Sequence, residues 1–551
     1  MEVYKYTKHC DQKPHNKAVI YKACLEQQPP MDFSAQFKAI AALLAMFILY
    51  KLWLGKPKNK LAKGKKAPEP VGAWPIIGHL HQLAGTEPLT RTISAMADKY
   101  GPGFMLRLGM HRTFVVCGWE IAKDCFTTND KVLATRPKSA SGDNMSYNYA
   151  MFGFSPYGAY WREMRKIATL ELLSNRRLDT LKHVRVGEID ECMKGLYRRW
   201  VENGRRPVQV EMKQRLFELT FNVLIMMIVG KRFFGDILGG TDEAEAIKIR
   251  QLMERSSYLS GVFVVSDALP FLKSLDLQGH EKAMRGIAAE LDSLLSTWLK
   301  EHRQKRLCGE TNGEQDFMDV MVSTLESAQI SSYDPDTIIK ATSQILIEAG
   351  TDTTAVALAW GISLLINHPD VVKKAQAEVD THVGQDRNVD DSDIKNLPYI
   401  QAIVKETLRL YPPAPLAIPH MAMEDCQIGG YHVPKGTHVM LNLWRLHRDP
   451  SVWAEPDEFR PERFFTTHVG TDVRGQHFEL LPFGSGRRSC PGQALAIPVL
   501  QLTLARLIHG FDFSTPKGGP IDMTERLHIT LNKANLVDVL VSPRLPSKLY
   551  E

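Results

Sequence analysis

Long amphipathic stretches dominate the hydrophobic pattern of this chain between about residues 90 and 545. Apolar positions recur at helical spacing in four of them, at 184–203, 280–306, 337–366 and 369–382. Three short segments alternate apolar and polar residues, which predicts strands at 105–109, 113–117 and 438–444. The sequence contains no internal repeat and no low-complexity tract. The pattern therefore predicts a mainly α-helical body with small β-sheets.

An unbroken apolar run, AIAALLAMFILY at 39–50, lies near the N-terminus. With its flanks it extends over 33–54, which provides the roughly 20 apolar residues that a bilayer-spanning helix needs. A buried core helix and a cleaved signal peptide are the alternatives. However, lysines follow the run instead of a small-residue cleavage site. These lysines predict that 33–54 is a transmembrane anchor and that the body after it lies in the cytosol.

The remaining segments divide the chain further. Residues 1–30 are polar and aperiodic, and Met31 reads like a second start, so we expect an N-terminal extension without a catalytic role. Residues 55–80 are basic and then rich in proline, which predicts a stiff neck. Residues 81–551 form the predicted catalytic domain, in which the polar stretch 307–316 reads as a surface loop.

Composition excludes several classes of protein. The 551-residue chain has a net charge of only +6, and nucleic-acid-binding domains usually carry a denser basic stripe. None of its eight cysteines is spaced as Cys-x-x-Cys, so a structural zinc site is not expected and the thiols should be reduced. No glycine-rich dinucleotide or phosphate-binding motif is present, so the chain needs an external source of electrons for any redox chemistry.

One cysteine has unusual neighbours, in LLPFGSGRRSCPGQALA at 480–496. Cys490 is either a buried structural thiol or a metal ligand. A metal-binding thiolate needs positive potential, which Arg487 and Arg488 or a helix beginning at Pro491 could supply. Glycines allow tight turns and the close approach of a flat ligand, and an aromatic ring can form an apolar wall. These residues are Phe483, Gly484, Gly486 and Gly492.

The spacing F-x-x-G-x-R-x-C-x-G, from Phe483 to Gly492, resembles the haem-binding signature of the cytochrome P450 monooxygenases. The resemblance implies a helical haem-thiolate fold behind a membrane anchor, with haem b bound and Cys490 as the axial iron ligand. It covers about residues 67–545 and is closest to microsomal plant enzymes of specialised metabolism, with a leaning to family 82.

Three other motifs carry the same resemblance. Glu406 and Arg409, in KETLRL, can pair on one helix face, and Arg463 in FRPERF completes a structural cluster of the family. AGTDTT at 349–354 interrupts a helical run with poor helix formers, and glycine alone costs about 1 kcal/mol there. The resemblance makes Asp352 a proton relay and Thr353 a hydrogen-bonding partner for dioxygen.

The resemblance also implies residues that hold the cofactor and the substrate. Haem propionates would contact Trp161 and Arg165 in WREMR, together with Arg488 and His420, while Phe483 would pack near the haem. Pro498 is a departure, because a proline within the helix after Cys490 removes a hydrogen bond. The implied substrate pocket consists of Met151, Phe152, Ala349, Leu416, Ala417, Ile418, Leu527 and Thr530.

The implied reaction is hydroxylation of a small hydrophobic plant metabolite, a terpenoid, flavonoid or alkaloid, with O2. Electrons would come from the NADPH-cytochrome reductase of the endoplasmic reticulum membrane, docked on a basic surface that includes Arg487. Two alternatives stay open. One is a haem-thiolate isomerase or dehydratase without need of external O2, although the acid–alcohol pair Asp352 and Thr353 argues against it. The other is a non-enzymatic membrane haem-binding partner.

Overall fold

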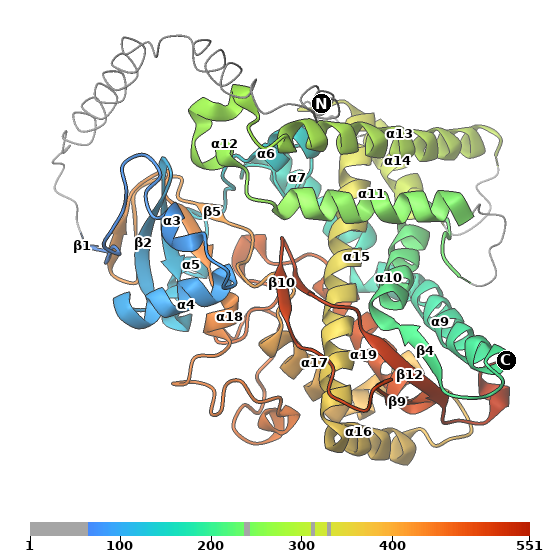
Figure 1. Cartoon of the computed structure of the whole chain (residues 1–551). Coiled ribbons are helices and arrows are strands. Elements are labelled where there is room, and N and C mark those ends of the chain that lie inside the picture. Colours follow the sequence, from blue (N-terminus) through green and yellow to red (C-terminus); the bar gives the residue numbers. More distant parts are fainter. Residues whose placement is uncertain (1–63, 236–242, 310–314, 328–331) are drawn as a thin grey trace, which may run out of the picture. The chain divides into compact units, whose positions relative to one another are not determined.

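The computed structural model of the chain describes residues 64–235, 243–309, 315–327 and 332–551 (Figure 1). The predicted anchor at 33–54 and the extension at 1–30 lie outside the described residues. Residues from Ala62 onward form one compact unit. The neck enters this unit early, because β1 (Lys65–Lys66) pairs in parallel with β7 (Tyr431–Val433).

The helices of the first half include two long ones, α9 and α13. In chain order they are α3 (Leu80–Leu83), α4 (Leu89–Tyr100), α5 (Trp119–Phe126), α6 (Ala140–Met145), α7 (Ala159–Ile167), η2 (Ala168–Leu172), α8 (Asn175–Thr180), α9 (Lys182–Glu202), α10 (Met212–Val229), α11 (Glu243–Gly261), α12 (Val265–Ala268), η3 (Pro270–Leu275) and α13 (His280–Leu307).

The helices of the second half include the longest of the described elements, α15. They are α14 (Phe317–Ser327), α15 (Pro335–Asn367), α16 (Pro369–His382), η4 (Asp391–Asn396), α17 (Pro398–Leu410), α18 (Leu443–Leu446), η5 (Pro461–Phe465), η6 (Gly486–Arg488), α19 (Gln493–Gly510) and η7 (Ser547–Leu549).

The strands form four small sheets. Their spatial orders are β1-β7-β6, β2-β3-β8-β5, β4-β12-β9 and β10-β11. The remaining strands are β2 (Gly103–Leu108), β3 (His111–Val116), β4 (Val208–Glu211), β5 (His420–Met421), β6 (Cys426–Ile428), β8 (His438–Leu441), β9 (Phe511–Ser514), β10 (Glu525–Leu527), β11 (Leu531–Lys533) and β12 (Asp538–Pro543). A mainly α-helical fold with small sheets is thus confirmed.

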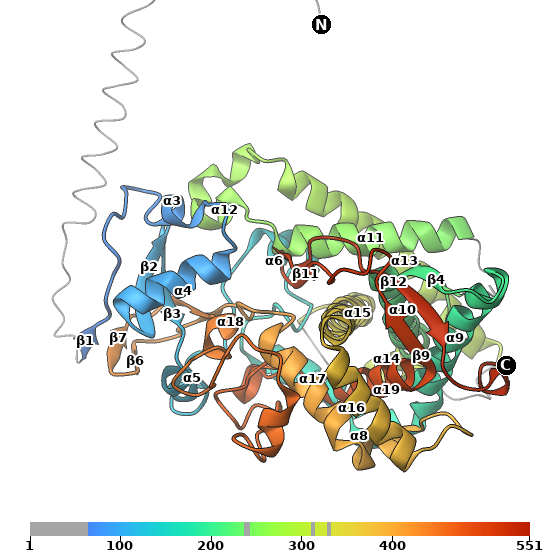
Figure 2. The same cartoon turned by 60° about the horizontal axis from the view of Figure 1, so that its bottom comes forward.

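Helix α15 runs through the centre of the unit, as Figure 2 shows nearly along its axis. It begins at Pro335, where the side chain of Asp334 accepts a hydrogen bond from the Thr337 amide at 3.0 Å, and Pro369 begins the next helix. Helices α10, α13, α14, α17 and α19 contact it. Among the described helices α15 alone is long and apolar enough to cross a bilayer, but 72% of its apolar window is buried within the protein.

The four predicted helices correspond to α9, α13, α15 and α16, whose ends lie within about two residues of the prediction. The sequence was wrong at two other boundaries. The predicted strand 438–444 ends at Leu441, because the side chain of Asn442 caps α18. The side-chain amide of Asn442 also donates to the Thr90 carbonyl at 2.8 Å. The helix predicted to begin at Pro491 begins at Gln493 and continues through Pro498.

Candidate active site

The loop before α19 presents the thiol of Cys490 at the N-terminus of that helix. The Cys490 amide donates to the Phe483 carbonyl at 2.8 Å, which closes the loop. Gly486 has a φ of +66°, and a Cβ there would lie 2.3 Å from a carboxylate oxygen of Asp130, so only glycine fits. The sequence around Cys490 is therefore shaped to hold the thiol in one place.

The surroundings of Cys490 act on its pKa in opposite directions. Burial raises the pKa of the thiol, while the amides of Gly492 and Gln493 and the charge of Arg165 lower it. Both amides lie at the N-terminus of α19, where backbone N–H groups have no partner within the helix and are free to point at the sulfur. Of the two predicted sources of positive potential, the helix N-terminus does act on the sulfur through its amides, whereas Arg487 and Arg488 do not. The cation beside the thiol is Arg165, which donates to the Ser489 carbonyl at 2.7 Å.

The two arginines of the loop point elsewhere. Arg487 is exposed and pairs with Asp130 at 3.3 Å. Arg488 lies over the ring of Trp161 at 4.4 Å and donates to the carbonyls of Ala134, Phe152 and Ser155. Arg488 therefore connects the loop to the segment before α7, where Trp161 is buried.

Arg488 belongs to a group of neighbouring cationic side chains to which the described residues provide no carboxylate. Burial, and after it the charge of Arg488, lowers the pKa of Arg136 to about 9. Burial, and after it the charge of Arg165, lowers the pKa of Arg488 to about 9. His420 lies beside these arginines as a neutral imidazole, because burial with the charge of Arg136 lowers its pKa well below the usual value.

Within the described part of the chain, the hydrogen bonds of Arg136, Arg488 and His420 go only to main-chain carbonyls. Arg136 donates to Ile418 and Pro419 at 2.5 and 2.9 Å, and Nδ1 of His420 donates to Leu133 at 2.7 Å. Buried charges in proteins are normally paired with opposite charges. A haem carries two propionate carboxylates, so this cationic group and the thiol of Cys490 fit a bound haem. Arg136 was missed by sequence analysis, because nothing in ATRPKS distinguishes it from a solvated arginine.

Helix α15 has one accessible stripe in its otherwise buried middle. Residues 354–365 are all buried, whereas Ile345, Glu348, Asp352 and Thr353 are partly accessible and Ala349 is exposed. The spacing of three and four residues places these side chains on one helix face. The predicted catalytic pair and the predicted pocket residue Ala349 therefore share a face that is open to a ligand.

Asp352 is held by two hydroxyl groups from distant elements. Its Oδ2 accepts hydrogen bonds from Ser257 of α11 at 3.1 Å and from Thr530 at 2.7 Å. Burial raises the pKa of Asp352, although both hydrogen bonds lower it. Thr353 donates its own hydroxyl proton to the Ala349 carbonyl at 2.7 Å, so its oxygen is left as an acceptor.

The structure gives a packing reason for the glycine in the middle of α15. A Cβ at Gly350 would lie 2.9 Å from the Leu224 side chain of α10. On the same side, the hydroxyl of Thr220 donates to the Thr351 carbonyl at 3.2 Å. Gly350 lowers the stability of the helix but allows α10 and α15 to approach closely. The glycine is therefore explained by packing and not only by the predicted catalytic residues Asp352 and Thr353 that follow it.

The predicted pocket residues have different environments. Met151 and Phe152 are buried, and Met151 packs with Ala341 of α15. Thr530 is buried and uses its hydroxyl on Asp352. Ile418 is exposed, and its carbonyl accepts a hydrogen bond from Arg136. The others, Leu416, Ala417 and Leu527, are half-buried.

The structure brings Glu406, Arg409 and Arg463 together in a fully buried cluster. Arg409 donates to Glu406 at 2.7 and 2.8 Å, and Arg463 donates to it at 2.8 Å. The remaining guanidinium protons go to carbonyls of residues 447–458, which form an irregular segment. Because the charges are paired and far from solvent, the cluster stabilises this segment.

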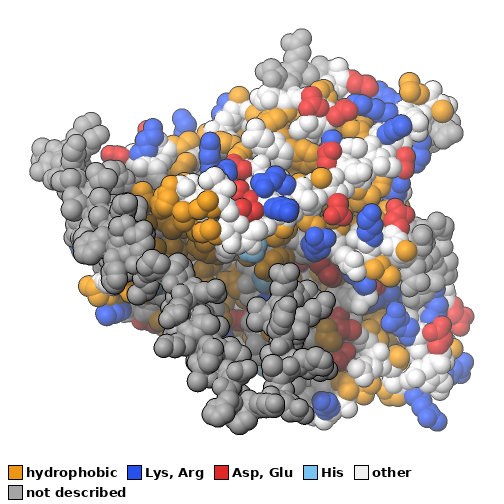
Figure 3. Space-filling view, turned by 45° about the horizontal axis from the view of Figure 1, so that its top comes forward, with side chains coloured by type: hydrophobic (Ala, Val, Ile, Leu, Met, Phe, Trp, Pro, Cys, Tyr) orange, Lys and Arg blue, Asp and Glu red, His pale blue; other side chains and the backbone are white. Residues whose placement is uncertain are grey.

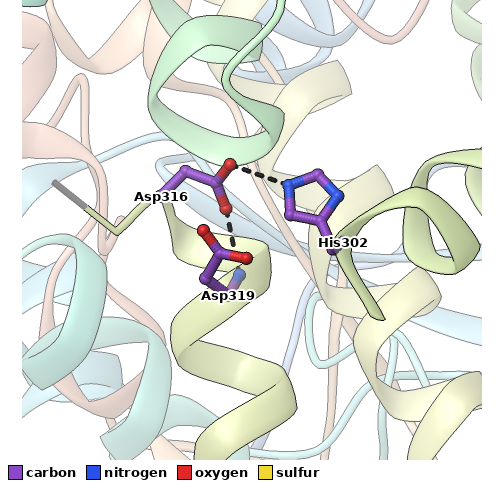
Figure 4. A group of neighbouring side chains, drawn as sticks. All are labelled: His302, Asp316 and Asp319. Atoms are coloured by element: carbon purple, nitrogen blue, oxygen red, sulfur yellow. Dashed lines mark hydrogen bonds and ion pairs between the residues drawn. The ribbon is translucent and has the colours of Figure 1, made fainter. Parts of the chain in front are cut away.

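A second group of potential metal ligands lies where α13 and α14 meet (Figure 4). His302 Nδ1 donates to the Trp298 carbonyl at 2.7 Å, and Nε2 lies 2.8 Å from Asp316. Asp316 also accepts from the Asp319 amide at 3.0 Å, at the start of α14. Burial lowers the pKa of His302, but the hydrogen bond to Asp316 and the other neighbouring groups together outweigh burial, and the pKa is raised above its ordinary value. The arrangement is that of an ion pair that joins two helices.

Comparisons with known proteins agree with this geometry. The family model described as "Cytochrome P450" matches residues 68–540. Xanthotoxin 5-hydroxylase, cytochrome P450 82C4, of Arabidopsis thaliana is 52% identical over 531 residues, 94% of this chain and 100% of its own length. Strychnine-10-hydroxylase of Strychnos nux-vomica is 50% identical, and flavonoid-6-hydroxylase of Mentha piperita 48% identical, with the same coverage of both chains.

A solved structure has the same fold. A zebrafish cytochrome P450, determined with progesterone, superposes with a TM-score of 0.70 and 26% sequence identity. The match covers 83% of this chain and 100% of the other.

Proposed function

This chain belongs to the cytochrome P450 family, within plant family 82, and is a haem-thiolate monooxygenase; we propose that it hydroxylates a polycyclic plant metabolite. The observation that carries the proposal is the thiol of Cys490, fixed by its loop at the start of α19 with two amides aimed at the sulfur. Relatives of about 50% identity are named as hydroxylases of a furanocoumarin, an alkaloid and a flavonoid. They do not favour an isomerase or a dehydratase.

The residues that would hold the cofactor come from four parts of the chain. Cys490 would bind the iron, and Arg136, Arg165, Arg488 and His420 would face the propionates. When bound, haem supplies the activation of O2 and the insertion of one oxygen atom into a C–H bond. The protein's share is to fix the cofactor and to position substrate and protons.

Asp352 and Thr353 are the residues we assign to proton supply. Burial raises the pKa of Asp352, which favours exchange of its proton nearer to neutral pH. Its Oδ2 is tied to Ser257 and Thr530, so the carboxyl group has a defined orientation. The hydroxyl oxygen of Thr353, the next residue along the helix, can accept a hydrogen bond from a water molecule or hydroxyl group that carries a proton into the site.

We further propose that the enzyme lies on the endoplasmic reticulum membrane. An apolar surface around α12 supports this, and Figure 3 shows hydrophobic side chains gathered on that side of the molecule. The amide of Met110 donates to the Ala268 carbonyl at 2.9 Å, which brings the β2–β3 turn against α12. The exposed apolar residues are Val71, Trp74, Met110, Phe263, Phe271, Leu275 and Leu277.

Electrons would come from the NADPH-cytochrome reductase of the same membrane. The described sequence carries no nucleotide-binding motif of its own. Exposed Arg487, next to the Cys490 loop, belongs to the surface on which we expect an acidic reductase to dock. Charge reversal in Arg487→Glu should slow reduction of the haem, most strongly at low salt, without altering substrate binding.

The first test is a carbon monoxide difference spectrum of the reduced enzyme in membranes. A red-shifted Soret band supports the thiolate, and its loss in Cys490→Ala assigns the ligand. Reductase and NADPH are then added with xanthotoxin, strychnine and a flavone, and hydroxylated products are identified by mass spectrometry. A folded, haem-loaded enzyme without the red-shifted band contradicts the proposed function.

A further inference from the structure

Glu348 of α15 is a half-buried carboxylate that receives only neutral donors from the described residues. Its Oε1 accepts from Ser256 Oγ at 2.8 Å and from Gln344 Nε2 at 3.0 Å. No cation contributes to its electrostatic environment, in which burial, and to a smaller extent Asp352, raises its pKa. A carboxylate withdrawn from water is usually compensated by a positive charge, and Glu348 has none within the described protein.

The nearest lysine along the helix is committed elsewhere. Lys340, two turns before Glu348, donates to Asp292 at 2.6 Å and to Ser296 at 3.1 Å, both on α13. The charge of Lys340 is therefore already paired with Asp292 and does not compensate Glu348.

Glu348 shares the accessible stripe of α15 with the catalytic pair. It precedes Asp352 by four residues, so the Cβ atoms of these two residues are roughly 5–6 Å apart on one helix face. Thr353 is the next residue after Asp352 on the same accessible stripe. Ala349, between them in sequence, is exposed on the same face. A substrate that lies along this stripe, from Ala349 to Thr353, can therefore also contact Glu348.

We propose that Glu348 is a specificity-determining residue that binds a protonated amine of the substrate. The inference rests on the proposed hydroxylase function and narrows its substrate class to alkaloids with a basic nitrogen. Neutral donors already occupy Oε1, so the missing component is charge. An ammonium group supplies that charge together with an N–H donor. An anchor on the same stripe as Thr353 also restricts which carbon of the substrate faces the haem.

The test compares two ligands of the same skeleton on the haem-loaded full-length enzyme. 1-Benzyl-N-methyltetrahydroisoquinoline is a cation at neutral pH, and its N-formyl counterpart is neutral. Dissociation constants are measured by equilibrium dialysis and by the change in the haem spectrum. The variants are Glu348→Gln, which keeps the shape and removes the charge, and Glu290→Gln on an exposed position of α13 as the control.

We expect wild type and Glu290→Gln to bind the amine more tightly than the amide. Glu348→Gln should weaken binding of the amine by about 10- to 100-fold, the effect of losing a hydrogen bond to a charged group, and leave the amide within about threefold. A purely structural role would instead weaken both ligands alike.

Three results overturn the proposal: no amine preference in wild type, a preference that persists in Glu348→Gln, or equal loss for both ligands. Tighter binding of the amide that persists in Glu348→Gln would show a neutral hydrogen-bonding role instead. The carbon monoxide spectrum separates the two levels of inference. If the red-shifted band is absent from wild type, the proposed function fails; if it is present without amine selectivity, only the role of Glu348 fails.

Discussion

Arg136 provides the sharpest test of the cationic group, because its removal should affect the apoprotein and the haem complex in opposite directions. The substitution Arg136→Gln removes one of the buried charges and keeps an amide that can donate to the Ile418 or Pro419 carbonyl. Arg136 is only 9% exposed, so solvent screens its charge little.

The magnitude follows from the pKa of Arg136. Burial, with Arg488 as the second cause, lowers this pKa from its ordinary value above 12 to about 9. A fall of three to four pH units corresponds to a cost on the order of 4–5 kcal/mol for keeping the charge buried at neutral pH. One carbonyl that loses its donor costs about 1–3 kcal/mol. The apoprotein of Arg136→Gln should therefore gain on the order of 1–4 kcal/mol in stability.

Whereas Arg136→Gln should stabilise the apoprotein, it should weaken the binding of haem. A lost charge-assisted hydrogen bond to a propionate weakens haem binding by about 10- to 100-fold. Apoprotein stability is measured by urea unfolding, and haem affinity by transfer of haem to apomyoglobin. Arg162→Gln, at an exposed position of α7, is the control and should change neither quantity. An apoprotein of Arg136→Gln that is less stable, together with unchanged haem affinity, would refute the assignment.

Three further predictions concern other parts of the molecule. Thr353→Ala should keep substrate binding but divert electrons to hydrogen peroxide, so that product formed per NADPH falls severalfold; unchanged coupling would contradict its role in proton supply. Arg463→Met should destabilise the protein by about 1–3 kcal/mol for each hydrogen bond from the charged guanidinium that is lost, since the carbonyls of Ala454 and Glu455 lose Arg463, and thermal unfolding measures this. The stability that wild type gains over His302→Gln should be full below pH 6.5 and disappear as pH rises through the raised pKa of His302, because the imidazolium pairs with Asp316 only when protonated. Urea unfolding at several pH values checks this, and a gain that grows with pH would show the pairing to be wrong.

The fold class and the position of the thiol were predictable from local pattern. The spacing of apolar residues predicts four of the long helices. The glycines, arginines and proline around Cys490 are unusual for a structural thiol. The start of α19 was not predictable in this way. Pro491 suits a first helical position, but Gly492 is the N-cap, and the free amides of Gly492 and Gln493 point at the sulfur.

Contacts between distant segments could not be predicted. Ser257 and Thr530 reach Asp352 across 95 and 178 residues of sequence, and neither residue stands out locally. Arg136 and Glu348 read as ordinary members of a turn and a helix. What distinguishes these two side chains is burial without an opposite charge nearby. That property arises only when the chain folds and cannot be seen in the local sequence.

The buried arginines of the Glu406 cluster have a consequence for how this protein tolerates change. Arg409 and Arg463 hold the segment 447–458 through its main-chain carbonyl groups, among them those of His447, Pro456 and Glu458. Carbonyl groups are the same in every amino acid, so this recognition does not depend on the side chains at those positions. Mutation can therefore remodel the exposed side chains of the segment while the backbone stays in place, and related enzymes can diversify that surface without first acquiring a new way to fold it.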